Sequence, residues 1–565
     1  MCDPETGNWI VFNGEIYNFR MVRSRLEQAG RRFNSQTDTE VVLKAYGCWG
    51  AECLQHFRGM FAIAIWDSAR RQLFLARDRF GEKPLYYSLR DGNLLFGSEV
   101  RSLLATGLVQ PIISEAGLVQ FLGFGSVCDP VTLVDGVRSL PPAHYAVWKD
   151  GELQATRYWS LENTFRTGTN TEWAQMPLDC LRERIRDAVE EAVVLRTVSD
   201  VPIGVFLSGG IDSGALVSIL SGRPGAALNT FSIVFPESDY SEAEFSRNIA
   251  HHFGTEHHEL RLCRTDALEC VTDAIAAMDQ PTIDGVNTFM ISRRAAEEGL
   301  KVALSGLGAD ELFAGYSTFR TVPLMERIAW LLGILGPRLR KMLSRVCRLL
   351  ATSNKGVKVA RLLSDPSLHP YSLMRGLFIP GQRDRLLLRV NPAAIAEADA
   401  PMHDCLWHSL RFDPINRVSS LELQNYMTNT LLRDTDSMSM AHSLEVRVPF
   451  VDHVLAELLF SLPGSAKVQG ATPKHLLVGS LRKSLPIEVV NRHKRGFTLP
   501  FEHWLRTDLR QEVEKVLLSD TSLNEWIDRR EVRKVWTGFL TGKLNWSRPW
   551  SLYVLGKWAS SCGLS

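Results

Sequence analysis

The chain has 565 residues, a hydrophobic share of 45%, a charged share of 22% and a net charge of +1. This length and composition predict a globular enzyme of at least two domains. The nearly balanced charge gives no electrostatic reason to expect a nucleic acid or a membrane as a partner, so the sequence predicts neither. The ten cysteines form no CxxC pair, which favours reduced thiols and a cytoplasmic location over a disulfide framework or a zinc site.

Short strand patterns begin the chain. Residues 9–13 (WIVFN) are mostly apolar and predict a strand, and residues 58–67 (RGMFAIAIWD) alternate as a half-buried strand does. Asn13 and Gly14 close the first pattern. Taken alone, an Asn-Gly pair between apolar runs is typical of a type I′ hairpin turn.

The most informative stretch lies further along, after an amphipathic helix. Apolar residues recur at helical spacing from Leu178 to Val193. Residues 201–207 are an apolar run that predicts a buried parallel strand, and residues 211–220 predict a second helix. The tight turn Ser208-Gly209-Gly210 joins this strand to this helix.

A strand, a glycine turn and a helix together favour an anion site. The turn directs backbone N–H groups to one point, and the helix dipole adds positive potential there. Ser208 adds a hydroxyl donor, and the glycines let a phosphate approach the backbone. Asp212 places a carboxylate beside this site, which indicates a divalent cation between carboxylate and phosphate. The lysine of a GxxxxGK[ST] loop is missing, which excludes an ordinary kinase or GTPase cradle.

Two further strand patterns, residues 228–235 and 301–304, alternate with helical segments and predict a doubly wound parallel sheet. Residues 305–316 (SGLGADELFAGY) follow the later strand at its carboxyl end, where such sheets bind ligands. Their Asp310 and the earlier Asp212 come from adjacent strand ends. Residues 328–335 (IAWLLGIL) are too short to span a bilayer, and we expect a buried or partner-facing helix there.

Several motifs together carry a family resemblance. The segment SGGIDS resembles the pyrophosphate loop of ATP pyrophosphatases, and the whole chain resembles the glutamine-hydrolysing asparagine synthetase family. The other segments that carry the resemblance are NGEIYNF (13–19), SQTDTEVVL (35–43), RGMFAIAIWD (58–67), RDRFGEKPLYY (77–87), FGSEVRSLL (96–104), LLRDTDSMSMAHSLEVRVPFVDH (431–453), KHLLVGSL (474–481) and RHKRGFTLPFEHWL (492–505).

The resemblance implies a two-domain fold of the α/β and α+β classes. Residues 1–160 are expected to form a partial Ntn-type αββα glutaminase domain, that is, a class II glutamine amidotransferase domain truncated at its N-terminus. Residues 161–565 are expected to form an ATP pyrophosphatase (HUP-like) domain, a doubly wound parallel sheet with a helical C-terminal part.

The resemblance also implies an activity, with ATP and Mg²⁺ as cofactors. A carboxylate, aspartate in the family, is adenylated, and ammonia from glutamine then gives the amide, AMP and pyrophosphate. Asp212 and Asp310 would hold Mg²⁺, and Lys474 would contact the leaving pyrophosphate. The residues expected to contact ATP are Leu207, Ser208, Gly209, Gly210, Asp212, Ser213, Ile233, Ser305 and Gly306.

For the glutaminase half, the resemblance implies that Asn13 and Gly14 form an oxyanion hole and that Glu15 and Asp38 bind glutamine. The family's nucleophilic cysteine stands much further before this motif than Cys2 does here. We therefore expect that Cys2 is not the nucleophile, that the true start lies upstream or the half-domain is degenerate, and that this chain uses free ammonia.

One departure concerns the acceptor. Many family members have a glutamate where this chain has Leu307, which leaves aspartate and another carboxylate open as acceptors: a cell-surface sugar acid, a peptide or a β-lactam precursor. A non-catalytic nucleotide-binding remnant is a third reading, against which the intact Asp212, Asp310 and Lys474 argue. Small molecules are the expected partners, and a homodimer is compatible with the sequence.

Overall fold

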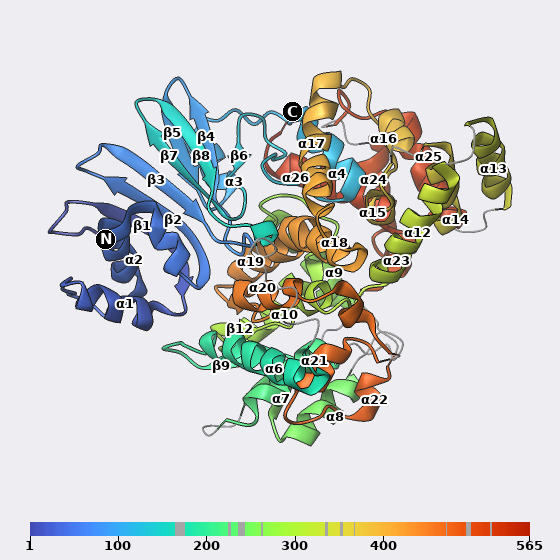
Figure 1. Ribbon diagram of the computed structural model, residues 1–565. Coiled ribbons are helices and arrows are strands. Elements are labelled where there is room, and N and C mark those ends of the chain that lie inside the picture. The colour runs from blue at the N-terminus through green and yellow to red at the C-terminus, as the bar shows by residue number, and fades with distance from the viewer. Residues whose placement is uncertain are drawn as a thin grey trace.

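The computed structural model describes residues 1–163, 176–223, 228–234, 243–261, 264–333, 337–350, 354–365, 368–470, 472–492, 499–519 and 523–564. The described strands form three sheets, two in the first 160 residues and one after residue 200. In Figure 1 the first two sheets lie at the upper left, the third lies at the bottom, and helices fill the right-hand side.

Antiparallel strands build the first sheet, with two helices on one of its faces. Its spatial order is β1 (Trp9–Ile16), β2 (Gly59–Asp67), β3 (Gln72–Arg77), β7 (His144–Lys149) and β8 (Glu152–Arg157). Helices α1 (Phe19–Gln28) and α2 (Asp38–Trp49) cover one face through a core that includes Leu26, Val41 and Phe61.

The opposite face of this sheet packs on the second sheet. That sheet has the order β5 (Asn93–Gly97), β4 (Tyr86–Arg90) and β6 (Arg138–Ser139). Small and branched side chains such as Ala64, Leu75 and Leu85 fill the space between the two sheets. Helix, sheet and sheet are thus stacked in layers, which agrees with the expected αββα-type arrangement.

Asn13 and Gly14 lie inside β1, so the hairpin alternative is wrong. They pair with Ala62 and Phe61 of β2 in a continuous antiparallel ladder. A Cβ atom on Gly14 would stand 2.1 Å from the carbonyl oxygen of Met60, and the φ of Gly14 is 148°. Glycine is therefore required here because two strands approach closely, and not because the chain turns.

The third sheet is parallel, as the alternation of strands and helices predicted. Its order is β11 (Glu256–Arg261), β10 (Asn229–Val234), β9 (Ile203–Phe206), β12 (Val302–Leu304) and β13 (Glu445–Arg447). Helices α6 (Leu178–Leu195), α7 (Ile211–Leu220) and α8 (Ala243–Phe253) share a core with Val205 and Leu304, and α10 (Val286–Glu297) packs with Phe231 and Ala303. Helices on both faces make the sheet doubly wound.

The remaining helices are η1 (Gly50–His56), α3 (Val100–Ala105), α4 (Glu115–Phe124), α9 (Arg264–Ala277), α11 (Ala309–Leu312), α12 (Thr318–Gly333), α13 (Pro337–Leu350), α14 (Asn354–Ser364), α15 (Pro370–Arg375), α16 (Pro380–Leu386), α17 (Pro392–Ser409), α18 (Pro414–Leu421), the π-helix η4 (Glu422–Leu432), α19 (Arg433–Met440), α20 (His453–Ser461), η5 (Gly464–Val468), α21 (His475–Ser480), α22 (Ile487–Val490), α23 (Phe501–Arg506), α24 (Arg510–Ser519), α25 (Arg529–Leu540) and α26 (Ser547–Ser561). Many of these helices, among them α12 to α17 and α23 to α26, fill the right-hand side of Figure 1, whereas α21 lies at the bottom beside α6. None of the described helices combines the length and the apolar character needed to cross a membrane.

The largest apolar core joins distant parts of the chain. Phe121 of α4 belongs to the same cluster as Val271 of α9 and Trp550 and Trp558 of α26. We propose a division into two domains near residue 160. The segment before this boundary then packs broadly on the C-terminal helices.

A buried ion cluster also connects the two parts. Asp452 accepts hydrogen bonds from Arg58 at 2.8 and 2.9 Å and from Arg196 at 3.1 Å. Burial acts against the ionised carboxylate, but the two arginines outweigh it and hold the pKa of Asp452 well below its usual value. Arg58 precedes β2, whereas Arg196 and Asp452 belong to the second part of the chain.

We expect Asp452→Asn to lower the free energy of unfolding by about 3–5 kcal/mol, because it removes the buried anion that Arg58 and Arg196 share and leaves Arg58 with its ion pair to the exposed Glu191. Since folding lowers the pKa of Asp452, its contribution is present above the ordinary pKa of 3.8 and is lost as the pH falls below that value. Chemical denaturation followed by tryptophan fluorescence measures both effects. Glu190→Gln, at an exposed ion pair with Arg482, is the matched control and should change little; an equal loss in both variants would contradict the account.

Candidate active site

A cavity of about 350 Å³ opens at the carboxyl ends of β9 and β12. Strands β10 and β11 lie on one side of β9, and β12 and β13 lie on the other, so the winding direction reverses at this point. Ligands of doubly wound sheets bind in the crevice at such a reversal. The sequence-predicted residues that line the cavity are Leu207, Ser208, Gly210, Asp212, Ser213, Ile233, Ser305, Gly306, Asp310 and Lys474. Gly209 lies within the same turn but is not among the lining residues.

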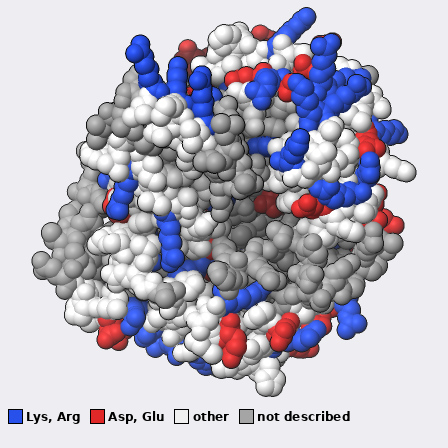
Figure 2. All heavy atoms as spheres, turned by 90° about the vertical axis from the view of Figure 1, so that its right-hand side faces the viewer, with Lys and Arg blue, Asp and Glu red and all other residues white. Residues whose placement is uncertain are grey.

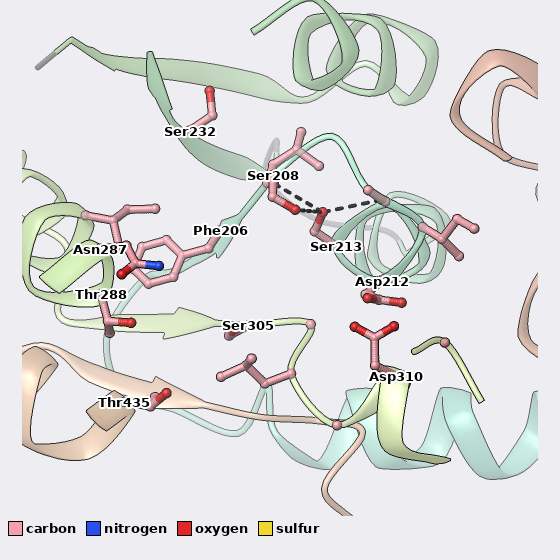
Figure 3. Close-up of a pocket in the computed structure, with 18 of the residues that line it drawn as sticks. Phe206, Ser208, Asp212, Ser213, Ser232, Asn287, Thr288, Ser305, Asp310 and Thr435 are labelled. Atoms are coloured by element: carbon pink, nitrogen blue, oxygen red, sulfur yellow. Dashed lines mark hydrogen bonds between the residues drawn. The ribbon is translucent and has the colours of Figure 1, made fainter. Parts of the chain in front are cut away.

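The turn between β9 and α7 is fixed by the hydroxyl of Ser213. This hydroxyl accepts a hydrogen bond from the backbone N–H of Ser208 at 3.2 Å and lies 3.2 Å from the Ser208 hydroxyl (Figure 3). Helix α7 begins at Ile211, directly after the turn. The first N–H groups of this ten-residue helix have no partner within the helix, so the turn and the helix end can hold an anion, as the sequence indicated.

Asp212 and Asp310 point toward each other across the cavity (Figure 3). Asp212 comes from the first turn of α7, and Asp310 comes from α11. The ammonium group of Lys474 contacts both carboxylates, with a distance of 2.5 Å to Asp310. The three residues are far apart in the sequence, and the fold brings them together as the sequence predicted.

Lys474 is held in place by its backbone and by its neighbours. It is buried, it is the residue before α21, and its φ of 50° is unusual for a residue other than glycine. Burial opposes its charge, but Asp212 and Asp310 more than compensate and raise the pKa of Lys474. The ammonium group of Lys474 therefore lies as a cation between two carboxylates.

Gly315 leaves room for this cluster. A Cβ atom at this position would stand 1.9 Å from a carboxylate oxygen of Asp310 and 2.3 Å from the Cε atom of Lys474. Sequence reasoning missed this residue, because its importance depends on a contact with residues that are distant along the chain.

The lining of the cavity also includes residues that the sequence did not single out as site residues. Leu307, Ile291 and Val446 are apolar, whereas Glu311 and Tyr316 are polar. The Tyr316 hydroxyl donates a hydrogen bond of 2.7 Å to Glu311. Burial, together with the neighbouring Asp310, raises the pKa of Glu311.

Residues behind the cavity wall support the pair formed by Glu311 and Tyr316. The guanidinium group of Arg375 lies over the ring of Tyr316 at 4.9 Å and over the ring of Tyr426 at 3.9 Å. Arg375 also forms an ion pair with the buried Glu422 at 2.7 Å. Sequence reasoning did not single out Glu311 or Tyr316. The only signal was their place in the same motif as Asp310.

The predicted glutamine-binding residues lie together at the end of β1. Asp38 accepts a hydrogen bond of 3.0 Å from the backbone N–H of Ile16, and the side chain of Asn13 donates one of 3.1 Å to Ser98. Burial and the charge of Asp38 raise the pKa of Glu15 to about 7. Asn13, Gly14, Glu15 and Asp38 thus form one group, as the motif predicted.

Arg447 connects this group to the cavity. Its guanidinium lies 3.7 Å from the carboxylate of Glu15, and its carbonyl oxygen accepts a hydrogen bond of 2.9 Å from the backbone N–H of Ser305. One residue of β13 therefore contacts both Glu15 and the loop that begins at Ser305. Residues 493–498 of the segment RHKRGFTLPFEHWL lie outside the described residues.

Cys2 lies at the other end of β1. It pairs with Trp9, and Asn13 is about 13 Å further along the strand. We therefore expect Cys2→Ala to leave the release of glutamate from glutamine unchanged and low, because an oxyanion hole needs a nucleophile beside it. An assay of glutamate release from the variant and the unmutated chain measures this. Strong release that disappears in the variant would make Cys2 the nucleophile.

Comparisons with known proteins agree with the geometry. Residues 184–560 match the family described as asparagine synthase, and residues 1–159 match the glutamine amidotransferase domain. "Asparagine synthetase [glutamine-hydrolyzing] 1" of Bacillus subtilis is 31% identical over 98% of this chain and 85% of that protein. "Asparagine synthetase [glutamine-hydrolyzing] 3" of the same organism is 30% identical over 93% and 81%. "Amidase chry2" of Gibberella zeae is 26% identical over 91% and 80%.

Proposed function

Because the chain belongs to the asparagine synthase family of glutamine-hydrolysing ligases, we propose that it adenylates a carboxylate with ATP in the cavity between β9 and β12 and then amidates it. In the first step a carboxylate oxygen attacks the α-phosphorus of ATP, and pyrophosphate leaves. In the second step ammonia attacks the acyl carbon, the nitrogen loses a proton, and AMP leaves with the bridging oxygen.

The observation that carries this proposal is the buried contact of Lys474 with Asp212 and Asp310 beside the turn at Ser208. Nucleotide cleavage between the α and β phosphates creates charge on pyrophosphate, and a fixed cation stabilises that charge. Besides Asp212, the residues proposed to contact ATP are Leu207, Ser208, Gly209, Gly210, Ser213, Ile233, Ser305 and Gly306.

The two carboxylates also fit Mg²⁺. Both contact one ammonium group, so they are close enough to share one cation, and oxygen donors are those that Mg²⁺ prefers. Among the described residues no group of three or more acidic, histidine or cysteine side chains could hold a metal ion, so phosphate oxygens would complete the coordination. When bound, Mg²⁺ would neutralise charge on the triphosphate. Asp212 and Asp310 would orient the α-phosphate through it.

Glu311 is proposed to hold the incoming ammonia. It is buried, it lines the cavity beside Asp310, and the Tyr316 hydroxyl donates a hydrogen bond to one of its oxygens. The other oxygen of this carboxyl group can accept a hydrogen bond from an N–H group of ammonia and so aim the nitrogen lone pair at the acyl carbon. This would supply a polar group where Leu307 supplies none.

We expect Glu311→Gln to raise the KM for ammonia about tenfold or more, while carboxylate-dependent exchange between ATP and pyrophosphate stays close to that of the unmutated chain. The amide nitrogen of glutamine cannot accept a hydrogen bond, whereas the adenylation step does not use Glu311. Steady-state amide formation and exchange of labelled pyrophosphate measure the two steps separately. Equal losses in both assays would mean that Glu311 supports the fold or the metal site instead.

Aspartate is the first proposed acceptor, and another carboxylate, that of a cell-surface sugar acid, a peptide or a β-lactam precursor, is the second. Leu307 favours the second, because it lines the cavity where many family members have a glutamate. Pyrophosphate release with a panel of amino acids, sugar acids, peptides and β-lactam precursors separates the two. No release with any carboxylate would support a non-catalytic nucleotide-binding protein.

A further inference from the structure

Helix α13 carries an apolar stripe on its exposed side. Leu339, Met342 and Val346 are spaced so that they share one face of the helix, and they are 43%, 55% and 45% exposed. Residues with this spacing normally face a core. Here the helix packs with its other side, because Ser344 is buried and its hydroxyl donates a hydrogen bond of 2.7 Å to the carbonyl oxygen of Ala360 in α14.

Exposed basic residues border this stripe. Arg338, Lys341 and Arg345 have the same spacing, one position before each apolar residue, and all are exposed. The surrounding sequence strengthens the charge: residues 327–364 contain nine Lys and Arg residues and no Asp or Glu. The net charge of +1 for the whole chain conceals this local excess of positive charge.

The end of α12, which precedes α13 in the chain, also exposes apolar side chains. Trp330 is 72% exposed and Leu331 is 56% exposed. The sequence predicted a buried or partner-facing helix at residues 328–335, of which residues 334 and 335 lie outside the described residues. The exposures of Trp330 and Leu331 contradict burial. Helix α13 forms the right-hand edge of the molecule in Figure 1, and Lys and Arg gather over the upper part of that side in Figure 2.

We propose that the α13 surface, defined by Leu339, Met342 and Val346 with Arg338, Lys341 and Arg345, docks on an anionic lipid bilayer. A helix with an apolar stripe and a basic border lies in the interface of such a bilayer, with its apolar side chains among the acyl chains and its cations beside the headgroups. Charge complementarity favours an anionic bilayer as the partner of the α13 surface. An uncharged bilayer would bury the apolar side chains but would offer no negative charge to the basic residues beside them.

Co-sedimentation with vesicles tests the proposal on the full chain. The protein should sediment with vesicles of equal parts phosphatidylcholine and phosphatidylglycerol, and not with phosphatidylcholine alone. Met342→Glu and the double variant Lys341→Glu with Arg345→Glu should each weaken binding about tenfold or more. The matched controls are Leu108→Glu, at another exposed apolar position, and Arg530→Glu with Arg533→Glu, at exposed basic positions on α25; both should bind as the unmutated chain does.

Sedimentation that is equal with neutral vesicles, absent with both kinds of vesicle, or equally weakened in the controls would overturn the proposal. Size-exclusion chromatography tests the alternative of a second copy. If Met342→Glu converts a dimer to a monomer, the α13 surface is a contact between copies, and the lipid proposal is wrong. Pyrophosphate release by the same variants should be unchanged, because α13 does not line the cavity.

Discussion

Asp310→Ala and Asp212→Ala are each expected to lower carboxylate-dependent pyrophosphate release by about 10³-fold or more. Each change removes an oxygen donor proposed for Mg²⁺ and one of the two anions that hold Lys474. The triphosphate would then lose both its charge neutralisation and its alignment. Either loss alone would slow the reaction strongly. These two variants and the Lys474 variant therefore have the largest expected effects.

The measurement is pyrophosphate release at saturating ATP, with circular dichroism to verify the fold. Asp187→Ala, at an exposed carboxylate on α6, is the control and should keep its rate. Raised Mg²⁺ should restore part of the lost rate in the Asp212 and Asp310 variants. Near-normal release by either folded variant would mean that the metal lies elsewhere.

Lys474→Ala is expected to lower kcat by about 10²- to 10³-fold and to change the KM for ATP much less. The charge of Lys474 matters most when pyrophosphate leaves, and the loss of a group that acts mainly at that point lowers kcat. Its buried position and its contact with both carboxylates leave it little freedom to move before the reaction.

Initial rates over a range of ATP concentrations separate the two parameters for the Lys474 variant. Lys483→Ala is a suitable control, because Lys483 is exposed and its ammonium group donates a long hydrogen bond of 3.4 Å to the backbone carbonyl of Ser221. A large rise in KM with an unchanged kcat would show that Lys474 binds ground-state ATP and does not stabilise the leaving group.

Much of the nucleotide side of the cavity could be predicted, because its signals are local in the sequence. Residues 201–207 and 211–220 carry their own strand and helix patterns, and the structure places β9 and α7 within them. The serine and glycines between them need no distant partner to form the turn. The alternation of strands and helices predicted the parallel sheet. Because Asp212 and Asp310 follow strands of that sheet, their proximity could be predicted as well.

Other features depend on contacts that no local pattern reveals. Arg58 and Asp452 are 394 positions apart, and neither has a sequence signal that points to the other. Asn13 and Gly14 fit a turn by local propensity, but pairing with β2 overrides that propensity. The exposed stripe of α13 has the spacing of a buried face, and only the packing against α14 shows which side is covered.

The most direct test of the proposed chemistry follows the carboxylate oxygen. The chain is given ATP, Mg²⁺, ammonia and the best acceptor from the carboxylate panel, labelled with ¹⁸O in its carboxylate, and the products are analysed by mass spectrometry. Adenylation predicts one ¹⁸O atom in the phosphate of AMP, with unlabelled pyrophosphate as the other product. Formation of ADP and phosphate, or of AMP without label, would contradict an acyl-adenylate in the cavity between β9 and β12.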